Sequence, residues 1–461
     1  MARIFKPSKG KSSSKKPRNH RAGATSQRDF EVLRYADDGR GIAIDNGKVV
    51  FIDGALPGEK VHAELIKTGK RFDEARCLSV HSPSPLRVEP TCGVYQHCGG
   101  CQLQHLNYRG QLEYKQQRLK KIIAGIADDV AVGAMPSTAF GYRHRARLSY
   151  RLGHLGFRRR ASHEVENFVQ CPVLMPELEG AIDAVRGPLL AALKPSKSAE
   201  LHFALGTTAT GEVAVGLSLE DQAARTSTWC MALAKALAPA VMLQRVSSVG
   251  GEWCHPEAMP LNYDFSFRHA DTDEADSSQG RGEFFAGDFT QVNPAINQRV
   301  VEQCLSWLKP QAGDLIADFF CGLGNFSFPL AQCGARVVAM DAGAAMIERA
   351  RQVSARYPGE PAINFHLADL FDEGQIALPK GINKAVLDPP RAGAKALCQR
   401  LAGHKTLLEI VYISCDPATL ARDLVTLTEG GWRVQGAISV DMFPQTHHLE
   451  SMVYLTRSGL K

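Results

Sequence analysis

The segment "DLIADFFCGLGNFSFPLA", residues 314–331, decides the fold of the C-terminal part of this 461-residue chain. An apolar strand leads into a glycine-rich turn, and an apolar helix start follows the turn. Gly322 and Gly324 allow the backbone to approach a ligand at the N-terminus of that helix. Ser327 occupies the position of the third glycine in G-x-G-x-x-G, which disfavours NAD. The turn therefore predicts a site for a ligand that contains a nucleoside, and S-adenosylmethionine is the expected ligand in place of NAD.

Four further apolar segments have the composition of buried strands and alternate with segments typical of helices. They are "ARVVAMDA" (335–342), "INFHLADL" (363–370), "KAVLDPP" (384–390) and "EIVYISC" (409–415). Buried strands alternating with helices indicate a doubly wound, mainly parallel α/β domain, which we expect over residues 284–461. Asp341 ends the second strand about 20 residues beyond the turn, where an acid can hold ribose hydroxyls.

The ends of two later strands carry the candidate chemistry. The segment "DPPR", residues 388–391, has Arg391 where methylases of exocyclic amines usually have an aromatic residue that stacks on the target base. We therefore expect the methyl acceptor to be a carbon atom, which must be activated by another group. Cys415 ends an apolar strand and is followed by Asp416 and Pro417. A thiolate there could attack carbon 6 of a uracil, and carbon 5 would then accept a methyl group.

Such an adduct must lose the carbon-5 proton, which requires a base. The segment "FPQTHHLESMVYL", residues 443–455, offers Glu450, His447 and His448 just before the last strand. From the residues alone, any of the three could serve.

A cysteine cluster lies far upstream, in "CGVYQHCGGC", residues 92–101. The chain shows no signal peptide and no apolar run that could span a membrane, so we expect a reducing cytoplasm, where disulfides are rare. Cys92, Cys98 and Cys101 then predict a metal site, with Cys171 as the fourth ligand. By spacing alone, zinc held by four thiolates is about as good as an iron–sulfur cluster.

Basic segments suggest an RNA partner. Residues 1–28 carry nine Lys or Arg and no acid, which predicts a disordered basic tail. Residues 131–163 contain seven arginines interleaved with aromatic residues and no acid, a pattern that suits phosphates and unpaired bases. Short strands and the Asn46-Gly47 turn predict a small oligonucleotide-binding barrel over residues 29–88, and residues 89–283 form a central, mainly β region.

The chain resembles the RNA uracil-C5 methyltransferase family over nearly its whole length after the tail. The segments that carry the resemblance are "FTQVNPAINQ" (289–298), residues 314–331, "LDPPRAGA" (387–394), "VYISCDPATLARD" (411–423) and "HHLESMVYL" (447–455). A barrel of the TRAM type together with four cysteines is similar to the branch that methylates uracil 1939 of 23S rRNA. The resemblance implies a monomeric cytoplasmic enzyme that uses S-adenosylmethionine and carries a [4Fe-4S] cluster.

The resemblance also implies roles for individual residues. Cys415 is the nucleophile and Glu450 the base, and Cys92, Cys98, Cys101 and Cys171 bind the cluster. The residues of the methyl-donor site are Gln291, Phe320, Asn325, Asp341, Asp369 and Asp388. Asp341 replaces a usual Glu, Asp369 a common Asn, and Asp416 a frequent Asn.

Two alternatives remain at this stage. The same chemistry could act on tRNA or on another rRNA uridine, because the residues do not identify the nucleotide. A non-catalytic RNA-binding assembly protein would use the barrel, the central region (89–283) and the cysteines, but would not need Cys415 and Glu450. We also expect the helical part near residues 102–130 to pack on the 284–461 domain.

Overall fold

The computed structural model describes residues 26–194, 198–206, 211–220, 226–238, 240–248, 251–268, 277–356, 363–374 and 376–457. The predicted disordered tail, residues 1–28, lies outside this part of the chain up to residue 25, and at Gln27 and Arg28 the prediction is wrong because these residues belong to a strand. The chain divides into two compact units, one containing residues up to 84 except 37–39, and the other containing 37–39 and 85–461. No helix of the described residues is long and apolar enough to cross a membrane.

The first unit is a six-stranded sheet in the order β1-β5-β6-β4-β3-β2. Its strands are β1 (Gln27–Glu31), β2 (Arg34–Tyr35), β3 (Gly41–Asp45), β4 (Lys48–Asp53), β5 (Lys60–Thr68) and β6 (Phe72–Ser82). Asn46 and Gly47 join β3 to β4, both with positive φ (49° and 80°), as the predicted hairpin turn requires. The proline-rich segment "HSPSPLRVEP", residues 81–90, predicts a linker, and strand β6 includes its first two residues.

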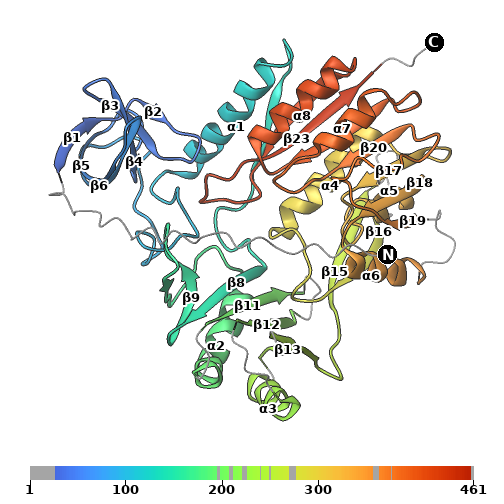
Figure 1. Ribbon diagram of the computed structural model, residues 1–461, viewed down its shortest axis with the longest axis horizontal. Helices are drawn as coiled ribbons and strands as arrows, with labels where there is room; N and C mark the ends of the chain where they lie inside the picture. The colour runs from blue at the N-terminus through green and yellow to red at the C-terminus, as the bar shows by residue number, and fades with distance from the viewer. Residues whose placement is uncertain are drawn as a thin grey trace, which may run out of the picture. The chain divides into compact units, whose positions relative to one another are not determined.

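Within the second unit, residues 145–254 form a seven-stranded sheet in the order β10-β9-β8-β11-β12-β13-β14. The strands are β8 (Arg145–Arg151), β9 (His154–Arg158), β10 (Val165–Glu166), β11 (Ser198–Leu205), β12 (Val213–Leu219), β13 (Met242–Ser248) and β14 (Gly251–Cys254). Helices α2 (Pro176–Leu193) and α3 (Ser227–Leu237) pack on it (Figure 1). Their buried leucines share one apolar core with the strands and with Cys101 and Cys171.

A two-stranded ladder follows this sheet. Strand β15 (Leu261–Arg268) pairs antiparallel with β16 (Ser277–Phe284). The polar composition of residues 271–283 predicts a loop, and this prediction is wrong for residues 277–283, which belong to β16. Backbone pairing with β15 satisfies this segment despite its polar composition.

Strand β7 and the strands from β17 to β23 form an eight-stranded sheet in the order β19-β18-β17-β20-β21-β23-β22-β7. Its strands are β7 (Val132–Met135), β17 (Leu315–Phe319), β18 (Arg336–Asp341), β19 (Ile363–Leu367), β20 (Lys384–Leu387), β21 (Glu409–Ser414), β22 (Arg433–Val440) and β23 (Glu450–Thr456). Strands β17 to β21 pair in parallel, and β23 pairs antiparallel with β21. The predicted doubly wound arrangement is therefore present.

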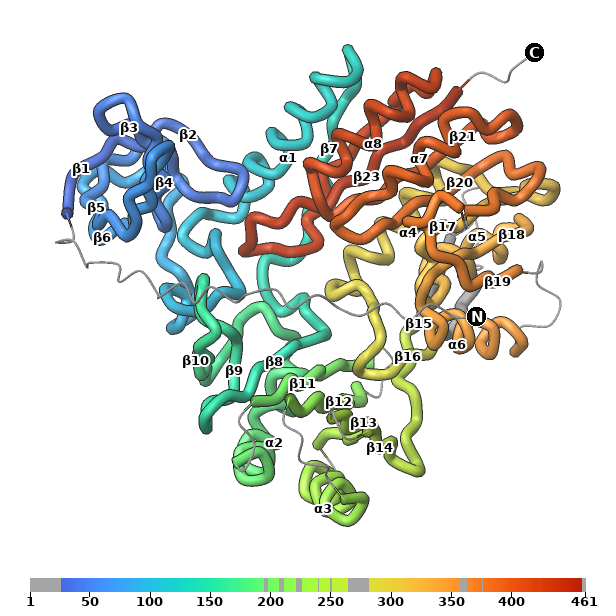
Figure 2. Tube along the Cα trace, viewed as in Figure 1, coloured from blue at the N-terminus to red at the C-terminus, as the bar shows by residue number. Residues whose placement is uncertain are grey.

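Helices cover both faces of this sheet, and alternate strand residues divide between them. Ala317 packs with α1 (Tyr108–Ala124), α7 (Lys395–Ala402) and α8 (Pro417–Glu429). Ile316 packs with α4 (Pro294–Leu308), α5 (Ser327–Gln332) and α6 (Ala344–Ser354). Figure 2 shows that α1 and β7 lie beside α8 and β23, although about 300 residues separate them in the chain.

Candidate active site

Thiol and carboxyl side chains gather at the edge of the eight-stranded sheet where its parallel strands end. Asp388 directly follows β20, and Cys415 directly follows β21. Glu450 is the first residue of β23, whose pairing with β21 places Ser414 opposite Ser451. Cys415 and Glu450 therefore occupy neighbouring positions across the ladder.

The electrostatics of this edge confirm the proximity of these groups. Burial, followed by the charges of Glu450 and Asp388, raises the pKa of Cys415 to about 12, while the charge of Arg391 opposes the shift. Burial, followed by the charge of Asp388, raises the pKa of Glu450 well above its usual value. In the ligand-free protein, Cys415 is therefore a protonated thiol at neutral pH.

The two histidines considered as alternative bases lie on the loop that precedes Glu450. Burial lowers the pKa of His447, and it lowers the pKa of His448 to about 4. Their rings lie 4.6 Å apart, centroid to centroid. Both histidines are therefore neutral at pH 7. Glu450, which is 4% exposed, is the candidate base that lies beside Cys415.

A pocket opens beside this edge and contains four of the six residues expected at the donor site, Gln291, Phe320, Asn325 and Asp388. The Gln291 side-chain amide donates to Asp388 at 3.3 Å. Phe320 has a φ of +65°, which is rare for a bulky residue and marks strain in the glycine-rich turn. Burial raises the pKa of Asp388 to about 7.

Asp341 and Asp369 lie at neighbouring strand ends, outside the lining of this pocket. One carboxylate oxygen of Asp341 accepts from the Gly322 amide at 3.0 Å, and the other accepts from the Gly343 amide at 2.7 Å. Each oxygen keeps a second lone pair for a hydroxyl. Asp369 is exposed, and its carboxylate accepts from the Phe371 amide at 2.9 Å.

Sequence reasoning missed several residues of the pocket and its support. Phe289, Tyr263 and Asn297 line the pocket, and Asn297 exchanges side-chain hydrogen bonds with Asn325 at 2.8 and 3.1 Å. Asp318 is fully buried below the turn, where the Ser327 hydroxyl donates to it, and burial raises its pKa to about 7. A carboxyl group inside the apolar run "LIADF" was the signal that could have revealed Asp318.

The four predicted metal-ligating cysteines converge in the central region. Cys92, Cys98, Cys101 and Cys171 line one cavity of about 130 Å³. Burial, together with the charges of the neighbouring thiols, raises the pKa of Cys101 to about 11 and that of Cys171 to about 12. The Gly100 amide donates to the Cys98 sulfur at 3.4 Å.

Arg160 holds the backbone of this cysteine segment. Its guanidinium donates to the carbonyls of Tyr95, Cys98 and Cys101 at 3.0, 3.2 and 2.8 Å, and it lies 4.8 Å from the Tyr95 ring centroid. This arginine, which the sequence places in an RNA-binding stretch, is therefore committed to a structural contact.

Other arginines of that stretch also have acidic partners. Arg147 and Arg158 both pair with Glu200, and Arg159 pairs with Glu164 and Glu166. The absence of acids within residues 131–163 did not reveal these pairs, because Glu164 and Glu166 lie just beyond the stretch and Glu200 is brought next to it by the pairing of β11 with β8.

In the described part of the chain, one group of three candidate metal-ligating atoms lies within 4.8 Å, and it is not formed by the cysteines. It consists of Asp29, His62 and His81 on the exposed face of the first unit, joined by hydrogen bonds of 2.7 and 3.3 Å. The cysteine sulfurs are therefore spread more widely than this group.

Comparisons with known proteins agree with this geometry. The family described as tRNA (Uracil-5-)-methyltransferase matches residues 271–357 and 376–458, and the TRAM domain matches residues 29–78. A protein of Vibrio campbellii named 23S rRNA (uracil(1939)-C(5))-methyltransferase RlmD is 35% identical over 99% of this chain and 100% of its own length. A Halomonas elongata protein of the same name is 37% identical over 94% of this chain and 90% of its own length.

The chain belongs to the RNA uracil-C5 methyltransferase family. A solved structure, the Pyrococcus abyssi tRNA (uracil-54, C5)-methyltransferase in complex with S-adenosyl-L-homocysteine, superposes with a TM-score of 0.69 at 24% identity. It covers 93% of this chain and 99% of that protein, so this uracil-C5 methyltransferase shares its fold. The predicted family, its class of enzyme and the N-terminal TRAM domain are therefore confirmed.

Proposed function

We propose that this protein methylates carbon 5 of a uridine in 23S rRNA, of the position-1939 type, with S-adenosylmethionine as the methyl donor. The observation that carries the proposal is the meeting of Cys415, Glu450 and Asp388 at one sheet edge beside a pocket. The names of the Vibrio and Halomonas relatives support the choice of RNA and nucleotide.

In the proposed reaction, the Cys415 thiolate forms a bond to carbon 6 of the uracil, and the electron pair moves to carbon 5 and the carbonyl oxygen. The electron pair at carbon 5 then forms a bond to the methyl group while the sulfur–methyl bond of the donor breaks, and the donor leaves as a neutral thioether. When bound, the donor supplies a methyl group activated by a positively charged sulfonium. Glu450 accepts the carbon-5 proton, the bond between carbon 6 and sulfur breaks, and the Cys415 thiolate leaves.

The raised pKa values of Glu450 and Cys415 bear on these two roles. The raised pKa of Glu450 makes its carboxylate a stronger base than an exposed glutamate. The raised pKa of Cys415 means that positive charge must assist thiolate formation, and Arg391 is the protein group that acts in that direction.

The donor site that we propose combines the pocket residues with the strand-end acids. Gln291, Phe320, Asn325 and Asp388 line the pocket, and Asp341 and Asp369 stand at the ends of the next two strands. The free lone pairs of Asp341 suit ribose hydroxyls, and its two amide contacts hold the carboxylate in place.

We further propose that Cys92, Cys98, Cys101 and Cys171 hold a [4Fe-4S] cluster. Zinc bound to sulfur at 2.3 Å in a tetrahedron requires sulfur–sulfur distances of about 3.8 Å. No three of the four thiols, all of which lie in the described chain, are that close, since no cysteine group meets a 4.8 Å limit. The wider spacing and the cavity of about 130 Å³ favour a larger group. Four thiolate ligands would leave no open iron position, which suits a structural role.

The proposed domain organisation accompanies these assignments. It has a TRAM barrel at 29–88, a cluster-bearing RNA-binding domain at 89–283 and a methyltransferase domain at 284–461, after a basic tail at 1–28. Within the range 89–283, the pairing of β7 with β22 and the contacts of α1 with α8 and β22 support the packing of residues 108–135 on the methyltransferase domain.

Mapping of 5-methyluridine in rRNA and tRNA from a deletion strain tests the RNA target. The proposal predicts loss at uridine 1939 of 23S rRNA alone, and loss from tRNA would contradict it. Wild type should form a stable covalent adduct with RNA that contains 5-fluorouridine at the target, because fluorine cannot leave as a proton. Cys415→Ala should form none yet still bind S-adenosylmethionine, while the exposed control Cys254→Ala should behave as wild type.

Anaerobically purified protein tests the cluster. It should contain iron and sulfide, and Cys171→Ser should lose both. Colourless wild-type protein with one zinc ion would overturn the cluster assignment and leave the methyltransferase assignment intact.

A further inference from the structure

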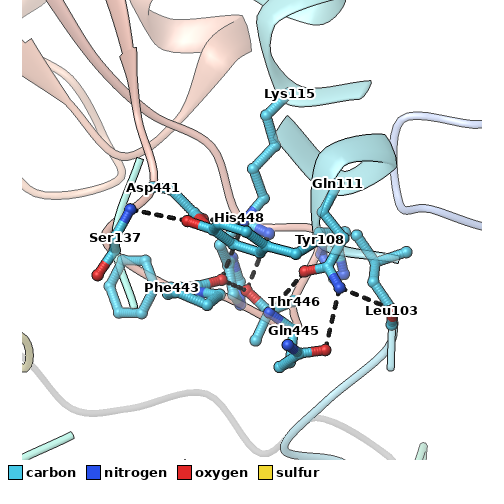
Figure 3. A network of polar contacts seen from close by, with 12 residues as sticks. Leu103, Tyr108, Gln111, Lys115, Ser137, Asp441, Phe443, Gln445, Thr446 and His448 are labelled. Atoms are coloured by element: carbon cyan, nitrogen blue, oxygen red, sulfur yellow. Dashed lines mark hydrogen bonds and ion pairs between the residues drawn. The ribbon is translucent and has the colours of Figure 1, made fainter. Parts of the chain in front are cut away.

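The loop of residues 441–449, between β22 and β23, is fixed through its own carbonyl groups. Lys115 of α1 donates to the Phe443 carbonyl at 2.9 Å and also pairs with Asp441 at 2.6 Å (Figure 3). Arg118, one turn further along α1, donates to the His447 carbonyl at 2.7 Å. Both ends of the loop are therefore held by one helix.

The middle of the loop is held by groups that belong to the cysteine site. The Tyr142 hydroxyl, on a side chain that lines the cysteine cavity, donates to the Pro444 carbonyl at 3.0 Å. The amides of Gln102 and Leu103, which directly follow Cys101, donate to the Gln445 carbonyl at 3.0 and 2.9 Å. Two consecutive loop carbonyls thus depend on the segment around the four cysteines.

Gln445 itself has an unusual conformation. Its φ is +68°, which lies in the left-handed region that residues other than glycine and asparagine rarely adopt. Gln445 is 3% exposed. Gln111 of α1 holds it from two sides, accepting from the Gln445 amide at 2.8 Å and donating to its side-chain oxygen at 3.0 Å (Figure 3). Surrounding contacts must maintain such a conformation, so it depends on them.

We propose that Gln445 is a positioning residue that couples the four-cysteine site to Glu450. Glu450 is the first residue after this loop, so the conformation imposed on Gln445 determines how the chain enters β23. Cys415, in contrast, follows β21 and has no part in the loop. Loss of the cysteine-site contacts should therefore impair proton removal at carbon 5 and spare thiol attack and methyl transfer. The inference rests on the proposed role of Glu450 as the base.

Tyr142→Phe tests the coupling, because it keeps the ring in the core and removes only the hydrogen bond to Pro444. In single-turnover reactions with RNA substrate and S-adenosylmethionine, methyl transfer should stay within about twofold of wild type. Release of the methylated adduct should slow about tenfold, as expected for loss of a buried hydrogen bond. Tyr454→Phe is the matched control, since the Tyr454 hydroxyl donates to Glu409, far from the loop, and both steps should keep wild-type rates.

The second test does not depend on activity. Hydrogen exchange of the amides in residues 441–449 should be faster in Cys171→Ser than in wild type, while exchange in β17 and β18 stays unchanged. Coupling is reciprocal, so Gln445→Ala should release iron to a chelator about tenfold faster than wild type. The backbone of Cys171 is hydrogen-bonded to Glu179 and Leu174, outside the loop, so faster exchange in residues 441–449 would report transmission through the cysteine site.

The outcomes separate this inference from the proposed function. If Glu450→Gln traps the methylated adduct but Tyr142→Phe slows neither step or slows both equally, the coupling is wrong and the base assignment stands. If Glu450→Gln releases product normally, the base assignment fails first. Unchanged exchange of residues 441–449 in Cys171→Ser would also overturn the coupling.

Discussion

Cys415 and Glu450 occupy neighbouring positions across the antiparallel ladder of β21 and β23, in which Ser414 is paired with Ser451. Strand β23 runs antiparallel to β21, so its first residue, Glu450, lies at the edge of the sheet where the parallel strands end. A nucleophile and a base can therefore approach one pyrimidine ring from adjacent strands.

Glu450→Gln should accumulate a covalent protein–RNA adduct that already carries the methyl group. Glutamine keeps the size of the side chain but cannot accept the carbon-5 proton, so thiol attack and methyl transfer survive and elimination fails. Denaturing gels and mass spectrometry of the adduct measure this result. His447→Ala and His448→Ala should turn over without trapping, and a methylated adduct in either histidine variant with normal turnover of Glu450→Gln would reassign the base.

The reactivity of Cys415 should depend steeply on pH in the ligand-free protein. With a pKa of about 12, the thiolate fraction rises about tenfold per pH unit between pH 7 and 10, and alkylation should follow it. Asp388→Asn removes a negative charge that raises this pKa, so alkylation at pH 8.5 should be faster than in wild type. Mass spectrometry of the labelled Cys415 peptide measures the rate, and equal rates in the two proteins would refute the charge effect.

The α/β domain could be predicted because its signals are local. Buried apolar runs between helices identify parallel strands, and Asp388 and Cys415 stand where such strands end. The roles of Glu450 and of the donor-site residues came from resemblance, since "HHLESMVYL" alone leaves three candidate bases. The structure adds the ladder register, which no local pattern contains.

Long-range backbone contacts escaped prediction for a physical reason. Strand β7 is only four residues long and pairs in parallel with β22, some 300 residues later. Gln445 gives no sign of its left-handed conformation, because glutamine does not favour it and the partners are the Gln111 side chain and amides near Cys101. Such positions are determined by tertiary contacts rather than by their own propensity.

Asp318→Asn should change how stability depends on pH. The pKa of Asp318 in the folded protein, about 7, lies above its unfolded value of 3.8. Its contribution is fully present below pH 3.8 and is lost as pH rises through 7. Wild type should therefore lose stability relative to Asp318→Asn as pH rises from about 4 to about 7, and the difference should level off above about pH 8. Thermal unfolding midpoints of the two proteins at four pH values measure the difference. A difference that is constant with pH would contradict the prediction.

Lys115 and Asp441 form an ion pair whose side chains are 2% and 1% exposed. Removing one member of a buried pair leaves the other charge without compensation and typically costs about 3–5 kcal/mol. Lys115→Met should therefore destabilise the domain by roughly that amount, measured by urea unfolding followed by tryptophan fluorescence. The length of methionine keeps most of the packing, so the loss reports the charge and the hydrogen bond to Phe443.

The double variant Lys115→Met/Asp441→Asn separates these two contributions. It removes the uncompensated carboxylate, so it should be more stable than Lys115→Met by about 1–3 kcal/mol, because neighbouring sites in one network are not additive. It still lacks the Lys115 hydrogen bond to Phe443, and for that reason its stability should stay below that of wild type. If the double variant were less stable than either single variant, the charge of Asp441 would have to be compensated by a group other than Lys115, and the ion pair would not be what holds this end of the loop.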